Sequence, residues 1–517
     1  MFDAVLKKAA KQLLEVADII VGENVAVTSD TWTSVADITF SNLTAHFINS
    51  NWEHVHLPIG CFSHSGLLTA DELFKKLLET FEKCGLRKEA IQAVIANGKS
   101  TMDACHGAIE WELIACIHQF IDLITSIVFD NGGVKSTIER ARQTVIFITD
   151  SNRAGEELDR RQVALNPASA PQKVINEVVA TWWSAYAMLE RMLELKHAVQ
   201  GLVEDGLLPE YLTHEDWNSM TEITDILRPF KNIQLLLEEP KYVSLSFVPF
   251  LISKIRKGLK QLYLDENYQA PIRGLIDKMI QKLEETFGSG EDGTAFQENM
   301  NRDPTSSSKG IPRKAFIAMA LDPRTKTLPT LHAEDKLLVW SVVSDHLCRE
   351  ITSLRNEGND GVDSKNKKLG GAISLNLGPE KGILEDLFDH NDDEFSAEEI
   401  PVHVIAQNEL TLYKHFKSLP MLDSEGRLSN PLVWWKMNEL ALPFLAKLAR
   451  KILNIPAAAV PSRSVFSTTE INNNLKRVRL CSDITGATVF LRDCWNTAEL
   501  QPKETSEGER KKRVRIN

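Results

Sequence analysis

The sequence is poor in cysteine and has no pair of cysteines placed to bind a metal together. Its seven cysteines are scattered over 517 residues, and no Cys-x-x-Cys pair occurs. An odd and dispersed set argues against a disulfide scaffold. Cys61 with His64, and Cys105 with His106, are isolated pairs that do not supply the four ligands of a tetrahedral zinc site. We therefore expect reduced thiols, no bound metal and no other cofactor.

Long apolar runs are also absent. The longest candidate, 115–129, is interrupted by His118, Gln119 and Asp122, and it is shorter than the roughly 20 residues that cross a bilayer. The opening 26 residues carry lysines and Glu15 on a helical pattern, unlike a secretory signal. We expect an intracellular protein without a membrane partner, and no pattern indicates a small-molecule substrate.

The chain lacks an overall excess of basic charge. It has 59 basic and 71 acidic residues, for a net charge of −12. The chain as a whole therefore lacks the excess of positive charge that is typical of nucleic-acid-binding domains. The acidic run 385–399 is typical of a solvated loop, with a partner-binding segment as the alternative. The block 510–515 has five basic residues in six. It is interpreted as a nuclear-import signal or a plain soluble tail, and we expect a nuclear protein.

What is present is a globular composition with two kinds of periodicity. Apolar residues make up 43% and charged residues 25% of the chain, which excludes a disordered polypeptide. The first hundred residues alternate helical and strand-like patterns, and Ala90–Ala96 is an apolar run typical of a buried parallel strand. This order predicts a mixed sheet. The helices are expected at 2–20 and 69–84, and the other strands at 24–33, 38–49 and 52–62.

From about 150 to 399 the pattern is helical almost throughout. Apolar residues recur at spacings of three and four, as on one face of a helix. The fold class expected is therefore α/β (mixed α+β) with a large all-α segment. We divide the chain into 1–165, which holds the sheet, a helical segment 166–404, a second core segment 405–497 and a disordered basic tail 498–517.

Several ordered motifs resemble the hAT superfamily of transposases. The stretch Asn430-Pro431-Leu432-Val433-Trp434-Trp435-Lys436-Met437-Asn438-Glu439 is followed by Pro443-Phe444-Leu445-Ala446-x-Leu448-Ala449 and by Val465-Phe466-Ser467. Four further pieces occur in the family's order: Thr28-Ser29-Asp30-Thr31-Trp32-Thr33-Ser34, Met188-Leu189-Glu190-Arg191, Ile226-Leu227-x-Pro229-Phe230 and Leu321-Asp322-Pro323-Arg324.

This resemblance covers about residues 5–497 and extends to the transposon-derived zinc-finger BED proteins. It implies an RNase H-like core interrupted by a large all-α insertion, with a helical C-terminal hAT dimerisation region. It also implies a homodimer, or a heterodimer with related hAT proteins. The chain begins at Met1-Phe2 without the Cys/His framework of a BED finger. Sequence-specific DNA binding is therefore left undecided, and an association with DNA or chromatin stays open.

The catalytic carboxylates that the resemblance implies are incomplete. A transposase of this kind cuts DNA with two divalent metal ions, and Mg²⁺ prefers oxygen ligands. The first carboxylate matches Asp30, which is present, whereas Ala96 and Arg463 occupy the other two positions. An arginine opposes the metal charge instead of neutralising it. We therefore expect no enzymatic activity and interpret Asp30 as a relic.

Neighbouring acids are too far away to replace the missing ones. Asp103 and Glu470 each lie seven positions downstream, which is about 10 Å along a helix. The two metals of such a site are only about 3.5–4 Å apart.

The resemblance also directs attention to the apolar residues of the C-terminal segment. Trp434 and Trp435 are adjacent and should face different sides of a helix, one in the core and the other as a dimer anchor. Lys476, Arg477 and Arg479 are candidate phosphate contacts, although an exposed basic helix end is the plainer account. The expected core and dimer face consists of Trp434, Trp435, Leu445, Leu448, Ile452, Val465 and Phe466.

The sequence thus predicts a domesticated, catalytically inactive hAT transposase-derived nuclear protein that acts through dimerisation and DNA or chromatin association. Two alternatives stay open. One is an active metal-dependent DNA transposase or nuclease. The other is a SUMO-ligase-like regulatory scaffold, which rests on resemblance alone because no RING-type metal framework is present.

Overall fold

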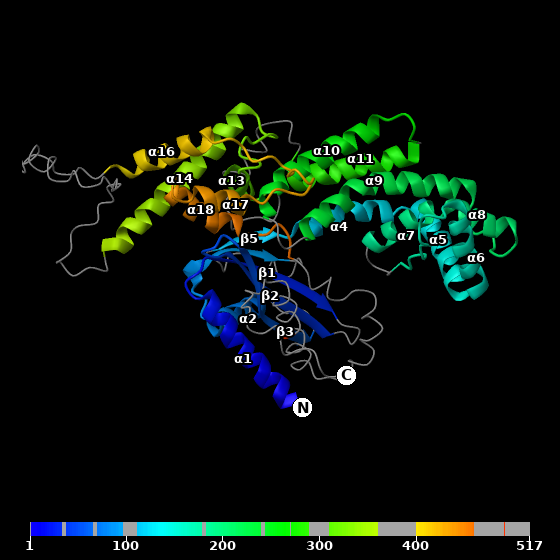
Figure 1. Cartoon of the computed structure of the whole chain (residues 1–517), viewed down its shortest axis with the longest axis horizontal. Helices are drawn as coiled ribbons and strands as arrows, with labels where there is room; N and C mark the ends of the chain where they lie inside the picture. The colour runs from blue at the N-terminus through cyan, green and yellow to red at the C-terminus, as the bar shows by residue number, and fades with distance from the viewer. Residues whose placement is uncertain are drawn as a thin grey trace, which may run out of the picture.

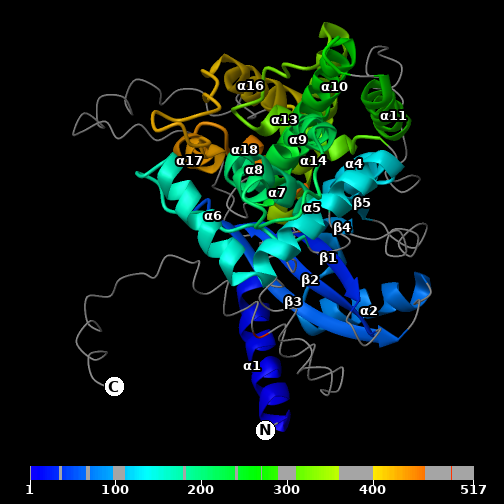
Figure 2. The same cartoon turned by 90° about the vertical axis from the view of Figure 1, so that its right-hand side faces the viewer.

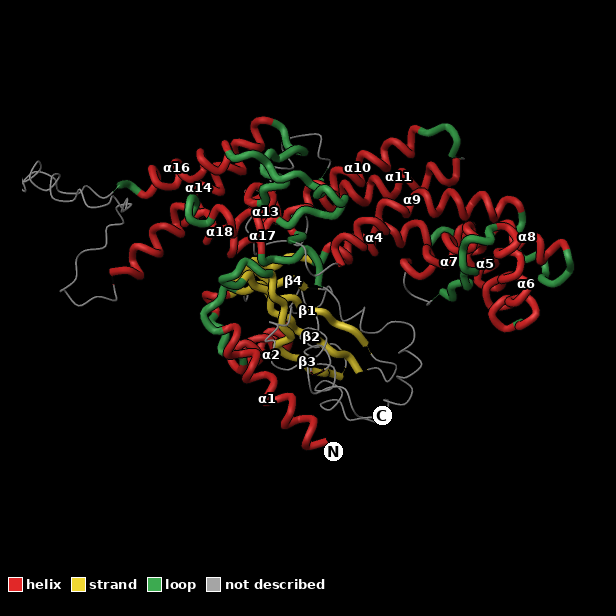
Figure 3. Tube along the Cα trace, viewed as in Figure 1, coloured by secondary structure: helices red, strands yellow, loops and turns green. Residues whose placement is uncertain are grey.

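A small mixed sheet is surrounded by many helices (Figures 1 and 3). A computed structural model of the chain describes residues 2–33, 38–65, 70–96, 111–177, 182–238, 243–268, 270–288, 310–359, 400–459 and 491. Helix is the dominant structure over these residues, as the helical periodicity of the sequence predicts.

The sheet has five strands in the order β3-β2-β1-β4-β5. The first three are antiparallel neighbours, and β4 is parallel to both β1 and β5. The sequence predicts the first four strands, but β5 has only four residues, too few to show an alternating pattern. The strands are β1 (Val25–Thr33), β2 (Ile38–Ile48), β3 (His54–Ser65), β4 (Ile91–Ala96) and β5 (Glu112–Ala115).

The two faces of the sheet belong to different cores because side chains alternate along each strand. Helices α1 (Phe2–Ile20) and α2 (Ala70–Lys83) cover one face, where Val27 and Leu43 pack in a small apolar cluster. On the other face, Ala26 and Ile95 join the large core shared with the remaining helices. Figure 2 shows α1 extending away from the sheet on the side opposite those helices.

An elongated helical body follows β5 and lies to one side of the sheet (Figure 1). Helices α5 and α6 pack against α7, α8 and α9 within this body, so it includes residues on both sides of the boundary expected at 165. Its described helices are α4 (Ile117–Phe129), α5 (Gly132–Asp150), α6 (Asn152–Leu165), α7 (Trp182–Glu194), α8 (Lys196–Glu204), α9 (His214–Glu238), α10 (Val248–Leu264) and α11 (Ala270–Phe287).

A second group of helices lies over the sheet on the side away from α5 to α8 (Figure 1). Helix α18 packs on β2 and on α13, and α14 and α16 run side by side. The C-terminal segment is thereby attached to the sheet even though more than 300 residues separate them in sequence. The group consists of α13 (Arg313–Leu321), α14 (Ala333–Asn359), α16 (Val402–His415), α17 (Pro431–Asn438) and α18 (Pro443–Leu453).

Candidate functional site

The strand that carries Asp30 lies beside the strand that ends at Ala96. Because β1 and β4 are parallel, their carboxyl ends lie at the same edge of the sheet. Ala96 is paired with Ser29, so it is one register position from Asp30. The fold therefore brings together two of the three positions that the hAT resemblance identifies as carboxylate sites.

The segment that leads to the third position reaches the same edge. The backbone N–H of Cys116, at the start of α4, donates to the carbonyl of Ala96 over 3.1 Å. The Sγ atom of Cys116 accepts a hydrogen bond from the N–H of Ala459 at 3.3 Å, and Ile117 N–H donates to Ala457 O at 3.1 Å. Residues 457–459 therefore lie close to the end of β4. Arg463, Val465, Phe466, Lys476, Arg477 and Arg479 fall outside the described residues.

Two of the side chains that the structure describes at this edge are small and completely buried. Ala96 is completely buried, and its methyl group offers no oxygen ligand. Ser29 is also completely buried, and its hydroxyl has no hydrogen-bond partner among the described residues. Over that same part of the chain, no group of three or more His, Cys, Asp or Glu is arranged to hold a metal.

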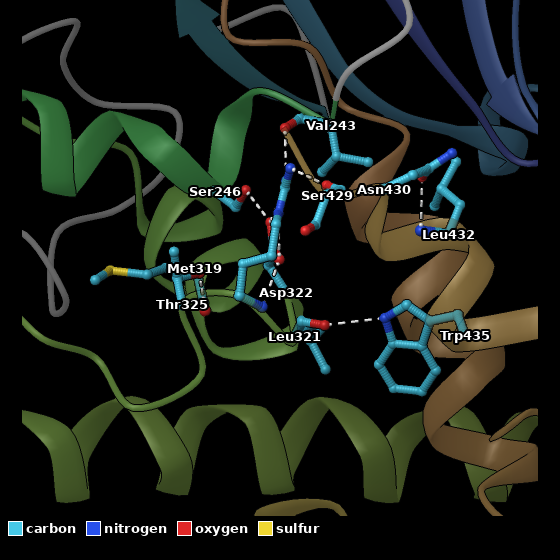
Figure 4. A network of polar contacts seen from close by, with 11 residues as sticks. Val243, Ser246, Met319, Leu321, Asp322, Thr325, Ser429, Asn430, Leu432 and Trp435 are labelled. Carbon is cyan, nitrogen blue, oxygen red and sulfur yellow. Dashed lines mark hydrogen bonds and ion pairs between the residues drawn. The ribbon is translucent and has the colours of Figure 1, made fainter. Parts of the chain in front are cut away.

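A buried ion pair occupies the junction between the helical body and the C-terminal helices (Figure 4). Asp322 follows α13, and Arg324 Nη2 lies 2.6 Å from its Oδ2, with both side chains completely buried. Arg324 also donates to the carbonyls of Ser429 (3.0 Å) and Val243 (3.2 Å). Ser246 Oγ donates to Asp322 at 2.6 Å. A buried pair needs such additional hydrogen bonds because desolvation of both charges is costly.

This junction fixes the position of α17. Trp435 donates its indole N–H to the carbonyl of Leu321, 3.0 Å away, at the end of α13. The Asn430 side chain caps α17 by accepting from the Leu432 N–H at 2.9 Å, and Pro431 follows at the first helical position, where its missing N–H is not needed. Figure 4 shows these contacts beside the ion pair. The motif Leu321-Asp322-Pro323-Arg324 therefore has a structural role.

Both tryptophans of the C-terminal motif are buried by the chain itself. Trp435 is completely buried and Trp434 is 9% exposed. Trp434 packs edge-on against Tyr413 and Phe416, whereas Trp435 stacks on Tyr413. The sequence predicts one ring in the core and the other as a dimer anchor. Both rings lie in the core, because Tyr413 of α16 contacts both of them and the end of α13 accepts a hydrogen bond from Trp435. Leu445, Leu448 and Ile452 are likewise buried, on α18.

The aromatic cluster around Trp435 extends to the sheet through Trp52, a residue that no sequence pattern singles out. Trp52 lies in the turn between β2 and β3 and stacks on Trp435 with ring centroids 6.0 Å apart. Its indole N–H donates to Glu439 at 2.9 Å, and the guanidinium of Arg450 lies over its ring at 4.6 Å. Arg450 also forms an ion pair with Glu439 at 2.8 Å. Ring stacking, a cation–π contact and a hydrogen bond therefore attach the turn to the C-terminal helices.

Three histidines lie together on the sheet face below α18. His46 and His56 are paired across β2 and β3, and His54 is close to both. Burial, followed by the neighbouring histidines His54 and His56, lowers the pKa of His46. Burial and then His54 lower the pKa of His56 to about 4. The His46 and His56 rings are therefore neutral at physiological pH.

Two further motifs lie in the core of the helical body. Met188 and Leu189 on α7 are completely buried, as are Ile226, Leu227 and Phe230 on α9. Glu190 accepts a hydrogen bond from the Tyr186 hydroxyl at 2.9 Å and pairs with Lys231 of α9. These motif residues therefore hold α7 and α9 together.

Comparisons with known proteins confirm the resemblance to hAT-derived proteins. Residues 409–494 match the hAT family C-terminal dimerisation region. Residues 114–226 match the ZBED1 RNase-like helical domain, which corresponds to the span from β5 to α9.

Curated relatives are similar along most of this chain. Zinc finger BED domain-containing protein 4 of Homo sapiens is 24% identical, over 90% of this chain and 37% of its own length. A Zea mays protein named as an AC transposase is 23% identical, over 90% of this chain and 56% of its own length. A Talaromyces stipitatus protein named as the transcriptional regulator tpeD is 20% identical, over 86% of this chain and 51% of its own length. The chain thus spans about a third to a little over half of these relatives.

The comparisons and the fold agree that this is an hAT transposase-like, BED-protein-like chain with a dimerisation region. Within the described residues, none of the helices combines the length and apolar character needed to span a bilayer.

Proposed function

We propose that this chain, which carries the dimerisation region of hAT transposases, is a domesticated and catalytically inactive relative of those enzymes. Its sheet and the position of its helical body support an RNase H-like core with an insertion, because β1 to β3 are antiparallel, β4 and β5 are parallel to β1, and the helices follow β5. In this proposal the core is kept as a scaffold that presents the C-terminal helices.

Ala96 is the observation that carries the proposal of inactivity. It ends a buried strand beside the strand of Asp30, where in-line cleavage of DNA would require a carboxylate. The backbone bonds from Ala96 to Cys116 and from Cys116 to Ala459 leave the methyl group in a packed, apolar corner. Arg463 adds a positive charge at the third position in the sequence, which opposes metal binding.

The test is a DNA cleavage assay with the full chain. Purified protein is incubated with supercoiled and linear DNA in the presence of Mg²⁺ or Mn²⁺, and we expect no cleavage above buffer. Metal-dependent cutting that disappears in the Asp30→Ala variant would contradict the proposal and favour an active nuclease.

We further propose that the protein self-associates in the nucleus and associates with DNA or chromatin. The match of residues 409–494 to a dimerisation region supports self-association. The basic block 510–515 and relatives named as transposases and as a transcriptional regulator support a nuclear location. A fluorescent fusion is expected in the nucleus, and neutralising the five basic residues of this block should shift it to the cytoplasm.

A further inference from the structure

An apolar stripe on the outer side of α17 has no partner within the described chain. Val433 and Met437 are four residues apart, so they lie on one side of α17. Leu440 lies in the turn that directly follows the helix. Their exposed fractions are 52%, 72% and 97%. Lys436 is the one charged residue among the exposed positions from 433 to 440, and its aliphatic stem can lie along an apolar surface with the ammonium group in water.

The opposite side of α17 is held firmly, so the stripe is presented in a fixed orientation. Trp435 donates a hydrogen bond to the Leu321 carbonyl and stacks on both Tyr413 and Trp52. The Asn438 side chain donates to the Trp434 carbonyl at 2.7 Å, and Glu439 is paired with Arg450. A surface that needs no rearrangement loses less entropy when a partner binds.

We propose that this stripe, Val433, Met437 and Leu440, is the centre of the contact between two copies of this chain. The inference rests on the proposed self-association and names the surface that carries it. The stripe lies inside residues 409–494, the part that matches a dimerisation region. The tryptophans of the same region are turned inward and buried. The contact therefore depends on the exposed residues of α17 and of the turn that follows it.

A twofold dimer suits the form of this stripe. In such a dimer the same patch on each copy meets itself, so two copies of α17 would cross and bury their apolar side chains together. Three side chains are too few for the roughly 800 Å² that each partner of a stable complex commonly buries. They are instead the small central set that carries most of the binding energy, while surrounding residues exclude water.

The test compares two matched triple variants of the full chain by size-exclusion chromatography with light scattering. One carries Val433→Ser, Met437→Ser and Leu440→Ser. The control carries Leu14→Ser, Leu165→Ser and Leu264→Ser, at positions with exposed fractions of 65%, 64% and 76% that lie outside 409–494. Circular dichroism and thermal unfolding verify that both variants fold, as expected for substitutions at exposed positions.

We expect the unmodified chain and the control to be dimers and the stripe variant to be a monomer. The chain concentration is about 10 µM, above the dissociation constant of a dimer of roughly micromolar affinity. The dissociation constant of the stripe variant should rise at least tenfold. A dimeric stripe variant would overturn this inference and leave the proposed self-association standing. A monomeric control would also overturn it, because the effect would not be specific to α17. An unmodified chain that is monomeric would overturn the proposed self-association itself, and this inference with it.

Discussion

Single residues at the junction around α13 decide how firmly the C-terminal helices are attached. Arg324 is completely buried with Asp322 and donates to carbonyls of two other segments. Its guanidinium also lies 4.3 Å from the ring centre of Phe247. The planar guanidinium group has five N–H donors, so it can bond a carboxylate and two carbonyls at once. A lysine ammonium group could not make the same set of hydrogen bonds.

Replacement of Arg324 by alanine should be strongly destabilising. We expect the free energy of unfolding to fall by about 3–5 kcal/mol, because Asp322 would stay buried without its partner. Chemical denaturation monitored by fluorescence measures the change. The matched control is Arg427→Ala, since the Arg427 side chain is 65% exposed in its pair with Asp423 and should change stability little. Equal effects of the two variants would contradict the structural role of the junction.

Tyr413 is buried, and its hydroxyl group makes no hydrogen bond to the residues that the structure describes. Its ring stacks on Trp435. Burial, with a smaller effect of Asp322, raises the pKa of this phenol. Tyr413→Phe should therefore leave stability unchanged or raise it by up to about 1 kcal/mol. A loss of more than about 1 kcal/mol in the same denaturation experiment would show that the hydroxyl is bonded.

Sequence patterns fail to predict how individual aromatic residues are buried. The sequence identifies Trp434 and Trp435 as important, but their burial depends on α16 and α13, which are distant in sequence. Trp52 has a positive φ of 63°, an uncommon conformation for a bulky residue. It is held by contacts with Trp435 and Glu439 that no local pattern could indicate.

At the scale of elements, the β2–β3 hairpin carries a pH-sensitive cluster. His56 has a folded-state pKa of about 4, lowered by burial and by His54, against about 6.5 in an unfolded chain. Between these values the unfolded chain binds more protons than the folded one, so stability falls as the pH is lowered.

We expect the free energy of unfolding to drop by on the order of 2 kcal/mol from pH 7 to pH 4 on account of His56. His46 is lowered in the same direction, and so is His346 on α14, to about 4. The variant His56→Gln should therefore lose only part of the pH dependence. Denaturation curves collected across this range measure it, and an unchanged dependence in the variant would rule out His56 as a contributor.

Helices and strands with a clear periodicity of apolar residues can be predicted from the sequence, whereas very short ones cannot. The sequence predicts α1, the first four strands and several long helices, because alternation or three-and-four spacing extends over enough residues. Strand β5 is recognised only through its pairing with β4. The predicted end of the first segment at 165 also falls between helices that pack together, since periodicity shows where a helix lies but not what it contacts.

At the scale of the whole molecule, the sheet, the helical body and the C-terminal helices meet around two connections. One is the ion pair of Asp322 and Arg324, and the other is the stacking of Trp52 on Trp435. In the account proposed above, these connections preserve the framework of a transposase after its metal ligands have been lost. The framework then serves to present α17 to a second copy.

Titration of the full chain with Mn²⁺ in a calorimeter tests the loss of the metal centre most directly. We expect no binding of two ions per chain at micromolar affinity, because Ala96 and Arg463 replace two of the three carboxylates. The double variant Ala96→Asp, Arg463→Glu should regain measurable binding if the fold still places these positions together. Two Mn²⁺ ions bound by the unmodified chain, and lost on Asp30→Ala, would contradict the account.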